Sequence, residues 1–116
     1  MFKKKKTEYN LLELTPELAR DFEEKGELVT ILIPKFKSEF FRKLIPKSKP
    51  KDIRINLDEL GTAVWKSIDG KKKVSDIVSE LSNSYGERIQ PAAERIAKFL
   101  EEIYKHKFIN FKEIKR

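Results

Sequence analysis

Few side chains in this 116-residue sequence could do covalent chemistry. His106 is the one histidine, and no serine lies in the G-x-S-x-G motif typical of activated nucleophiles. Asp58 and Glu59 are adjacent carboxylates, but neighbours on a helix point in different directions, and helix N-termini favour acids in any case. The four glycines form no phosphate-binding loop, and the absence of cysteine excludes disulfides and thiolate metal sites. We therefore predict a protein that is not an enzyme and has neither cofactor nor metal, with His106 as a favourable charge at a helix C-terminus.

Positive charge is concentrated in two stretches. The formal net charge is +7, and residues 35–54 hold eight basic and two acidic side chains. Residues 3–6 are all lysine and lie in a basic N-terminus, residues 1–9, that we expect to be flexible. Such surfaces attract acidic peptides, anionic lipid or nucleic acid, and equally they keep a protein soluble without any partner. Since no apolar run approaches the ~20 residues of a membrane span and no signal-peptide pattern is present, a cytoplasmic protein is the simplest expectation.

Two stretches favour β-strands clearly. Residues 28–33, LVTILI, are rich in β-branched side chains and apolar on both faces. Residues 52–57, DIRINL, alternate strictly between polar and apolar side chains, which predicts a half-buried strand. Between residues 33 and 52 lies a basic insert (35–51), in which residues 36–45 are amphipathic. They predict either a helix covering the sheet or a basic, aromatic surface that meets a membrane or a partner.

The N-terminal part is less clear. Residues 10–14 fit a short strand or an extended segment. For residues 15–26 the local signals favour a helix that begins at Thr15 and ends at Gly26. The same residues also fit the first arm of a hairpin, in which a turn at Gly26 leads into residues 28–33.

Helical periodicity dominates the second half of the chain. The pattern of residues 57–70 predicts an amphipathic helix with Asp58 as N-cap, Gly70 just past its end, and Trp65 as a core anchor. A second helix covers residues 75–85, a third begins near Pro91 and continues to about residue 107, and an apolar tail then folds back. Strands segregated from helices indicate an α+β fold. We predict a small winged helix-turn-helix domain, residues 10–116, with an N-terminal three-stranded antiparallel sheet followed by a three-helix bundle.

The run LDELGTAVWKSIDGKKKVSDIVSEL, residues 57–81, together with the following SYGERIQPAAERIAKFLEEI, resembles the PqqD-like family, named after coenzyme PQQ synthesis protein D. The residues that match the family pattern are Leu57, Glu59, Gly61, Ile68, Asp69, Gly70, Val74, Ile77, Tyr85, Gly86 and Pro91. The resemblance implies the winged helix-turn-helix fold, and it favours a strand for residues 16–25.

The resemblance also implies a function. Members recognise the leader of a ribosomally made precursor peptide, which adds as a strand to the third strand and lies against the third helix, and they deliver it to a modifying enzyme, often a radical SAM enzyme. The candidate peptide-binding residues are Ile53, Arg54, Ile55, Asn56 and Leu57 on the edge strand, and Ala92, Arg95, Lys98, Phe99 and Glu102 on the third helix. Phe99 would be an apolar anchor and Arg95 and Lys98 would pair with acidic leader residues, and Ile55→Pro should break strand addition.

Two alternatives to a peptide-binding adaptor stay open. A winged helix can bind DNA, but the helix that would enter the groove begins with Pro91, Ala92 and Ala93, which offer few donors to bases, and Glu101 and Glu102 would repel phosphates. The second alternative is peripheral membrane attachment through residues 36–45.

Overall fold

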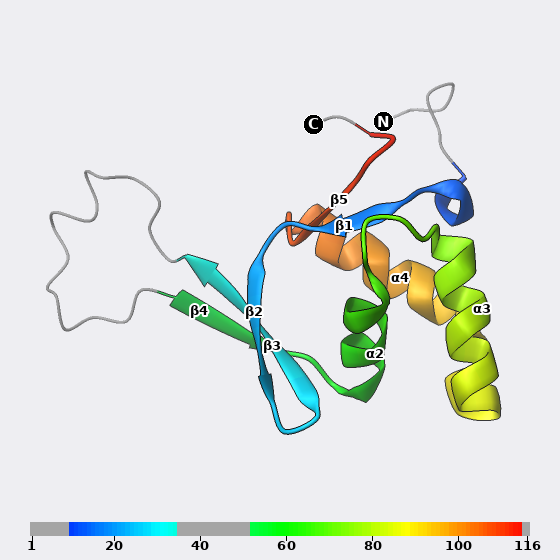
Figure 1. The fold of residues 1–116 in the computed structure, drawn as a ribbon, viewed down its shortest axis with the longest axis horizontal. Coiled ribbons are helices and arrows are strands. Elements are labelled where there is room, and N and C mark those ends of the chain that lie inside the picture. The colour runs from blue at the N-terminus through cyan, green and yellow to red at the C-terminus, as the bar shows by residue number, and fades with distance from the viewer. Residues whose placement is uncertain (1–9, 35–51, 115–116) are drawn as a thin grey trace, which may run out of the picture. The chain divides into compact units, whose positions relative to one another are not determined.

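The computed structural model describes residues 10–34 and 52–114 (Figure 1). The chain divides into two compact units: Arg20–Thr62 forms a sheet unit, and Met1–Ala19 with Ala63–Arg116 forms a helical unit. Among the described residues, the predicted small α+β protein with three α-helices and a three-stranded antiparallel sheet is confirmed. The winged helix-turn-helix arrangement and the single domain of residues 10–116 stay predictions. The predictions for the N-terminus, residues 1–9, and for the insert, residues 35–51, concern segments outside the described residues.

The sheet unit contains an antiparallel sheet in the order β2-β3-β4. Its strands are β2 (Asp21–Lys25), β3 (Leu28–Pro34) and β4 (Asp52–Asn56). Gly26, with φ of 62°, lies in the two-residue turn between β2 and β3, where a left-handed conformation suits glycine. The hairpin prediction is therefore confirmed and the helix alternative is wrong, because pairing with β3 outweighs the local helix signals.

The register of β4 against β3 is fixed at its C-terminal end. The backbone N–H of Leu57 donates to the carbonyl of Val29 at 2.9 Å. Hydrogen-bonded and non-hydrogen-bonded pairs alternate in an antiparallel sheet. The odd-numbered residues of β4 therefore direct their N–H and C=O groups toward β3, and the even-numbered residues direct theirs away. Asp52, opposite Pro34, is one of the even-numbered positions, so the missing N–H of the proline costs no hydrogen bond between β3 and β4.

Helix α2 (Glu59–Ser67) begins directly after the sheet. Asp58 is its N-cap as predicted, since its carboxylate accepts the N–H of Gly61 at 2.8 Å. Trp65 is fully buried, which confirms its expected place in the core. The predicted span 57–70 was too long, because the helix ends at Ser67 and Gly70, with φ of 78°, lies further along the connection to the next helix.

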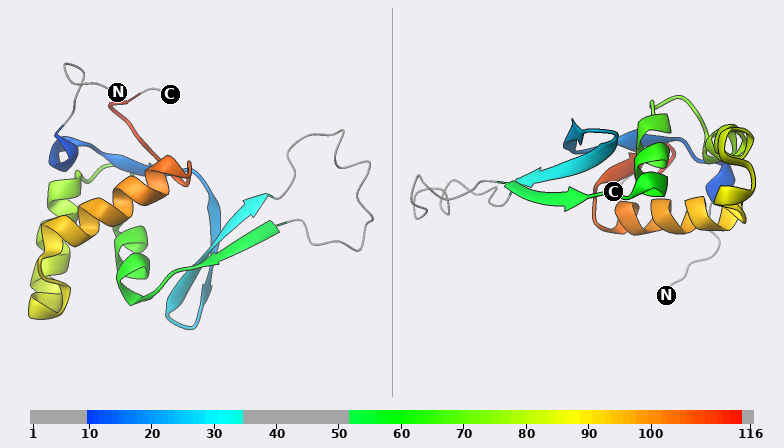
Figure 2. Two further views of the ribbon diagram at one scale, coloured as in Figure 1. Left: turned by 180° about the vertical axis from the view of Figure 1, so that it is seen from behind. Right: turned by 90° about the horizontal axis from the view of Figure 1, so that it is seen from below.

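The helical unit contains α3 (Val74–Tyr85) and α4 (Ala92–Lys105), which pack against each other (Figure 2). A short 3-10 helix, η2 (Gly86–Ile89), joins them, and Gly86 ends α3 as predicted. The core of α4 contains Ile96, Leu100 and Ile103 as expected. The helical spacing of apolar side chains predicts a buried face that includes Ala93, but Ala93 is exposed and Ala92 is buried instead.

A second sheet in the helical unit was not predicted. The apolar tail does fold back, and as β5 (Ile109–Phe111) it pairs antiparallel with β1 (Pro16–Leu18). Residues 10–14, expected to be extended, instead contain the 3-10 helix η1 (Leu11–Glu13), capped by the side chain of Asn10. The pairing of β1 with β5 joins segments from opposite ends of the chain, which no local pattern reveals.

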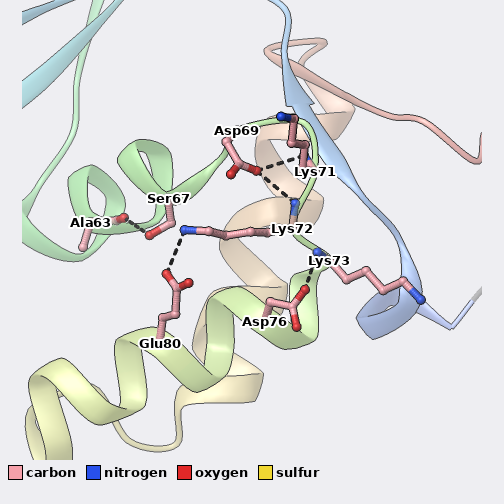
Figure 3. Close-up of polar contacts among 8 residues, drawn as sticks. All are labelled: Ala63, Ser67, Asp69, Lys71, Lys72, Lys73, Asp76 and Glu80. Carbon is pink, nitrogen blue, oxygen red and sulfur yellow. Dashed lines mark hydrogen bonds and ion pairs between the residues drawn. The ribbon is translucent and has the colours of Figure 1, made fainter.

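The connection from α2 to α3 is held by hydrogen bonds within itself and by contacts with acidic residues of α3 (Figure 3). The carboxylate of Asp69 accepts the N–H groups of Lys72 and Lys71, both at 2.9 Å, and these bonds lower the pKa of Asp69 below its usual value. The carboxylate of Asp76 accepts the N–H of Lys73 at 3.0 Å at the start of α3. The Lys72 ammonium also forms an ion pair with Glu80 at 2.9 Å, so this lysine-rich connection is positioned by neighbouring acids.

Candidate functional site

The outer edge of β4 is the first candidate site. Strand β4 lies at the edge of its sheet, and in the described part of the chain it pairs with β3 alone. By the register above, the backbone N–H and C=O groups of Asp52, Arg54 and Asn56 point toward this edge. A row of outward backbone groups is a template on which an extended peptide can add as a further strand.

The side chains of β4 give the two faces of this edge different characters. Ile53 and Ile55 lie on one face, where Ile53 is 45% exposed and Ile55 is half-buried. Arg54 and Asn56 lie on the opposite face, and both are exposed. Four of the five predicted edge residues are thus accessible to a ligand.

Leu57 requires a correction. It was predicted as a peptide-binding residue of the edge strand, but it lies beyond the end of β4 and is only 8% exposed. Its N–H is already bonded to the carbonyl of Val29. Because its backbone faces β3 and its side chain is buried, Leu57 anchors the strand and does not belong to the outer edge.

Residues of β2 and β3 hold the polar face of β4 in place. The Arg54 guanidinium donates to the Glu23 carboxylate of β2 at 2.8 Å, and this hydrogen bond lowers the pKa of Glu23. The Thr30 hydroxyl of β3 donates to Oδ1 of Asn56, also at 2.8 Å. Sequence reasoning did not find Glu23 or Thr30, because their roles follow from the pairing register alone.

The second candidate surface is the face of α4 that carries the other predicted residues. Ala92 was predicted to contact the peptide, but this residue is 3% exposed and belongs to the core. Lys98 and Glu102 are exposed and Phe99 is half-buried. The Arg95 guanidinium donates to the carbonyl of Arg88 at 3.0 Å, so this side chain also stabilises η2 ahead of the helix.

His106, the remaining candidate for chemistry, lies at the end of α4. His106 is the C-cap residue of α4, as its predicted position required, with its Nε2 3.5 Å from a carboxylate oxygen of Glu102. Across the described ranges 10–34 and 52–114, no cluster of three or more histidine, cysteine, aspartate or glutamate side chains has the spacing of a metal site. Within the same ranges, no helix has the length and apolar character needed to cross a membrane.

The hairpin of β2 and β3 adds evidence on DNA binding. Acidic side chains oppose binding to DNA because they repel its phosphates. The acids in this hairpin are Asp21, Glu23, Glu24 and Glu27, against Lys25 as the basic residue of the same stretch. Together with the donor-poor first turn of α4, this hairpin disfavours the DNA-binding alternative.

Comparison with known proteins identifies the family. The family model of coenzyme PQQ synthesis protein D (PqqD) matches residues 50–109, and these include β4 and the helices α2, α3 and α4. The chain belongs to the PqqD family. No curated protein and no solved structure gave a significant match. Family membership implies an accessory, peptide-binding protein related to PQQ synthesis, with a non-catalytic role.

Proposed function

We propose that this protein is an adaptor that recognises the leader of a ribosomally made precursor peptide by strand addition to β4. It then presents the peptide to a modifying enzyme, such as a radical SAM enzyme, in the synthesis of PQQ or of another peptide-derived product. The observation that carries the proposal is the edge position of β4, with the backbone groups of its even-numbered residues directed outward. The match of the PqqD family model over this strand supports it.

The backbone hydrogen bonds alone would give weak binding. A net contribution of about 0.5–1.5 kcal/mol per hydrogen bond is typical, whereas micromolar affinity requires about 8 kcal/mol. The outward positions of a five-residue strand supply only a few such bonds. Side-chain contacts must therefore supply much of the affinity, and the exposed faces of Ile53 and Arg54 are where β4 offers them.

We propose α4 as a further contact surface for the peptide. Phe99 supplies apolar area and Lys98 supplies positive charge for acidic leader residues, while Arg95 and Glu102 lie on the same side of the helix at helical spacing. Arg95 would then act with its guanidinium held by the Arg88 carbonyl. This surface is tested by its own variants, separately from the β4 edge.

Chemical-shift mapping tests the proposal directly. Because the cognate leader is unidentified, peptides are first selected from a displayed library of random dodecapeptides on the full-length protein. A selected peptide is then titrated into the isotopically labelled protein. The proposal predicts that amide shifts concentrate at residues 52–56 and along 95–102. Shifts confined to other regions, or no binding peptide at all, would show that β4 is not a peptide-binding edge.

A further inference from the structure

We infer that the β4 edge selects peptides in which acidic and apolar side chains alternate, with Arg54 and Asn56 recognising the acidic ones. This inference rests on the proposed strand addition and specifies the class of peptide that it favours. It follows from how the polar face of the sheet unit is built, residue by residue.

Arg54 and Asn56 stand side by side on one face at the edge. They are two residues apart on β4, and both occupy non-hydrogen-bonded positions opposite β3. Side chains at such positions lie close to their cross-strand neighbours. The neighbour of Asn56 is Thr30, beyond which lies Glu23 of β2. The neighbour of Arg54 is Leu32, beyond which lies Asp21, so the Arg54 guanidinium reaches diagonally across the sheet to Glu23.

Each of the two side chains is bonded on its inner side. The carboxylate of Glu23 accepts from Arg54, and the oxygen Oδ1 of Asn56 accepts from the hydroxyl of Thr30, which is itself only 3% exposed. With Oδ1 accepting from Thr30, the amide N–H groups are the donors that the exposed Asn56 side chain can offer to a ligand. A guanidinium carries donors and no acceptor. Both side chains therefore offer donors to a strand that adds at β4, and their inner partners reduce the entropy lost on binding.

Ligand side chains that match these donors are acceptors, and carboxylates make the strongest such bonds because the hydrogen bond is charge-assisted. In an added strand, successive side chains point to opposite faces. Those on the Arg54 face would be acidic, and those between them would lie on the face of Ile53 and Ile55, where apolar side chains cover exposed area. The favoured pattern is thus acidic-apolar-acidic-apolar.

Selection from the random dodecapeptide library tests this pattern on the full-length protein. The wild type should enrich aspartate or glutamate at alternate positions, with apolar residues between them. The double variant Glu23→Arg/Arg54→Glu keeps an ion pair and reverses the charge at the edge, so it should enrich lysine or arginine at the same positions. The milder Arg54→Gln should reduce the enrichment of aspartate and glutamate among the selected peptides. Its affinity for an acidic peptide should fall roughly two- to fivefold, which is typical of an exposed ion pair.

Thr30→Val tests the positioning of Asn56. The variant removes the hydroxyl that engages Oδ1 and should weaken the acidic preference at the peptide position beside Asn56, while the position beside Arg54 keeps its preference. A purely structural role of Thr30 would weaken all peptides equally.

The outcomes separate the two levels of the proposal. Peptides that lose binding in Asn56→Pro, yet show no acidic preference in the wild type or no change with Arg54→Gln, would overturn the selectivity while leaving strand addition in place. Peptides that bind Asn56→Pro as well as the wild type, or a selection that yields no peptide, would overturn both. If the double variant does not fold by circular dichroism, Arg54→Gln decides alone.

Discussion

The hydroxyl of Thr62, in the first turn of α2, accepts the backbone N–H of Val29 on β3 at 3.0 Å. Strand β4 has ended before this point, and the chain turns into α2. The N–H of Val29 therefore bonds to a side chain of the helix instead of to a further residue of β4. The adjacent bond from Leu57 to the carbonyl of Val29 fixes the same corner. The start of α2 thus sets the end and the register of the strand that we propose as the peptide-binding edge.

Thr62→Val should destabilise the sheet unit. The substitution keeps the shape of a side chain that is 5% exposed but removes the acceptor of a buried N–H, which typically costs about 1–3 kcal/mol. Urea unfolding followed by circular dichroism measures the change. Thr62→Ser retains the hydroxyl and is the matched control, which should stay closer to the wild type. Equal stability of the valine variant and the wild type would show that this bond contributes little.

Gly26→Ala should also destabilise the sheet unit, for a conformational reason alone. A Cβ at Gly26 would meet nothing within 4 Å, so no clash arises. The φ of 62° nevertheless places alanine in the left-handed region, at a cost of about 1–2 kcal/mol. Gly26→Asn should cost less, because asparagine tolerates this conformation better. If alanine and asparagine cost the same free energy of unfolding, backbone conformation would not be the cause.

The helical unit should lose stability in acid as the carboxylate of Glu113 becomes protonated. This carboxylate accepts the backbone N–H of Thr15 and the hydroxyl of the same residue, both at 2.8 Å, and the first of these bonds chiefly lowers the pKa of Glu113. A lowered pKa in the folded state means that the stabilisation is present above the unfolded pKa and is lost as pH falls through the folded pKa. The free energy of unfolding should therefore fall further between about pH 6 and about pH 3 in the wild type than in Glu113→Gln. Parallel pH profiles for the two proteins would contradict this role.

Lys98→Glu should weaken binding of an acidic peptide selected on the wild type. Lys98 is exposed on α4, so its reversal changes charge and leaves the core intact. A loss of roughly two- to fivefold in affinity is expected for an exposed ion pair, and it should shrink as salt is raised. Lys105→Glu, at the end of the same helix, is the control for a non-specific charge effect. An equal loss in both variants would remove Lys98 from the proposed surface.

Local patterns predicted most of the elements correctly. The β-branched run of β3, the alternation of β4, the Asp58 cap and the glycine after α3 each depend on near neighbours in the sequence. Residues 15–26 carried conflicting local signals, and the conflict was decided by pairing with β3. The pairing of β1 with β5 joins distant segments, so it could not be read from periodicity.

The candidate site was predictable only as a strand and a helix face. Which backbone groups of β4 point outward depends on the register of this strand against β3. The same register shows that Ile55→Pro, expected from the sequence to break strand addition, does not test it. The N–H of Ile55 points toward β3, so proline there would break the sheet itself. The support given by Glu23 and Thr30 crosses from one strand to the next and was invisible in the sequence.

The most direct test of strand addition compares three variants for the affinity of one selected peptide, measured by calorimetry. Asn56→Pro removes an outward N–H and the side chain, Asn56→Ala removes the side chain alone, and Glu24→Pro removes an outward N–H at the opposite edge, on β2. Strand addition at β4 predicts that Asn56→Pro binds about tenfold more weakly than Asn56→Ala, the equivalent of one lost hydrogen bond, while Glu24→Pro binds like the wild type. Equal affinities of Asn56→Pro and Asn56→Ala, or an equal loss in Glu24→Pro, would contradict peptide binding at the β4 edge.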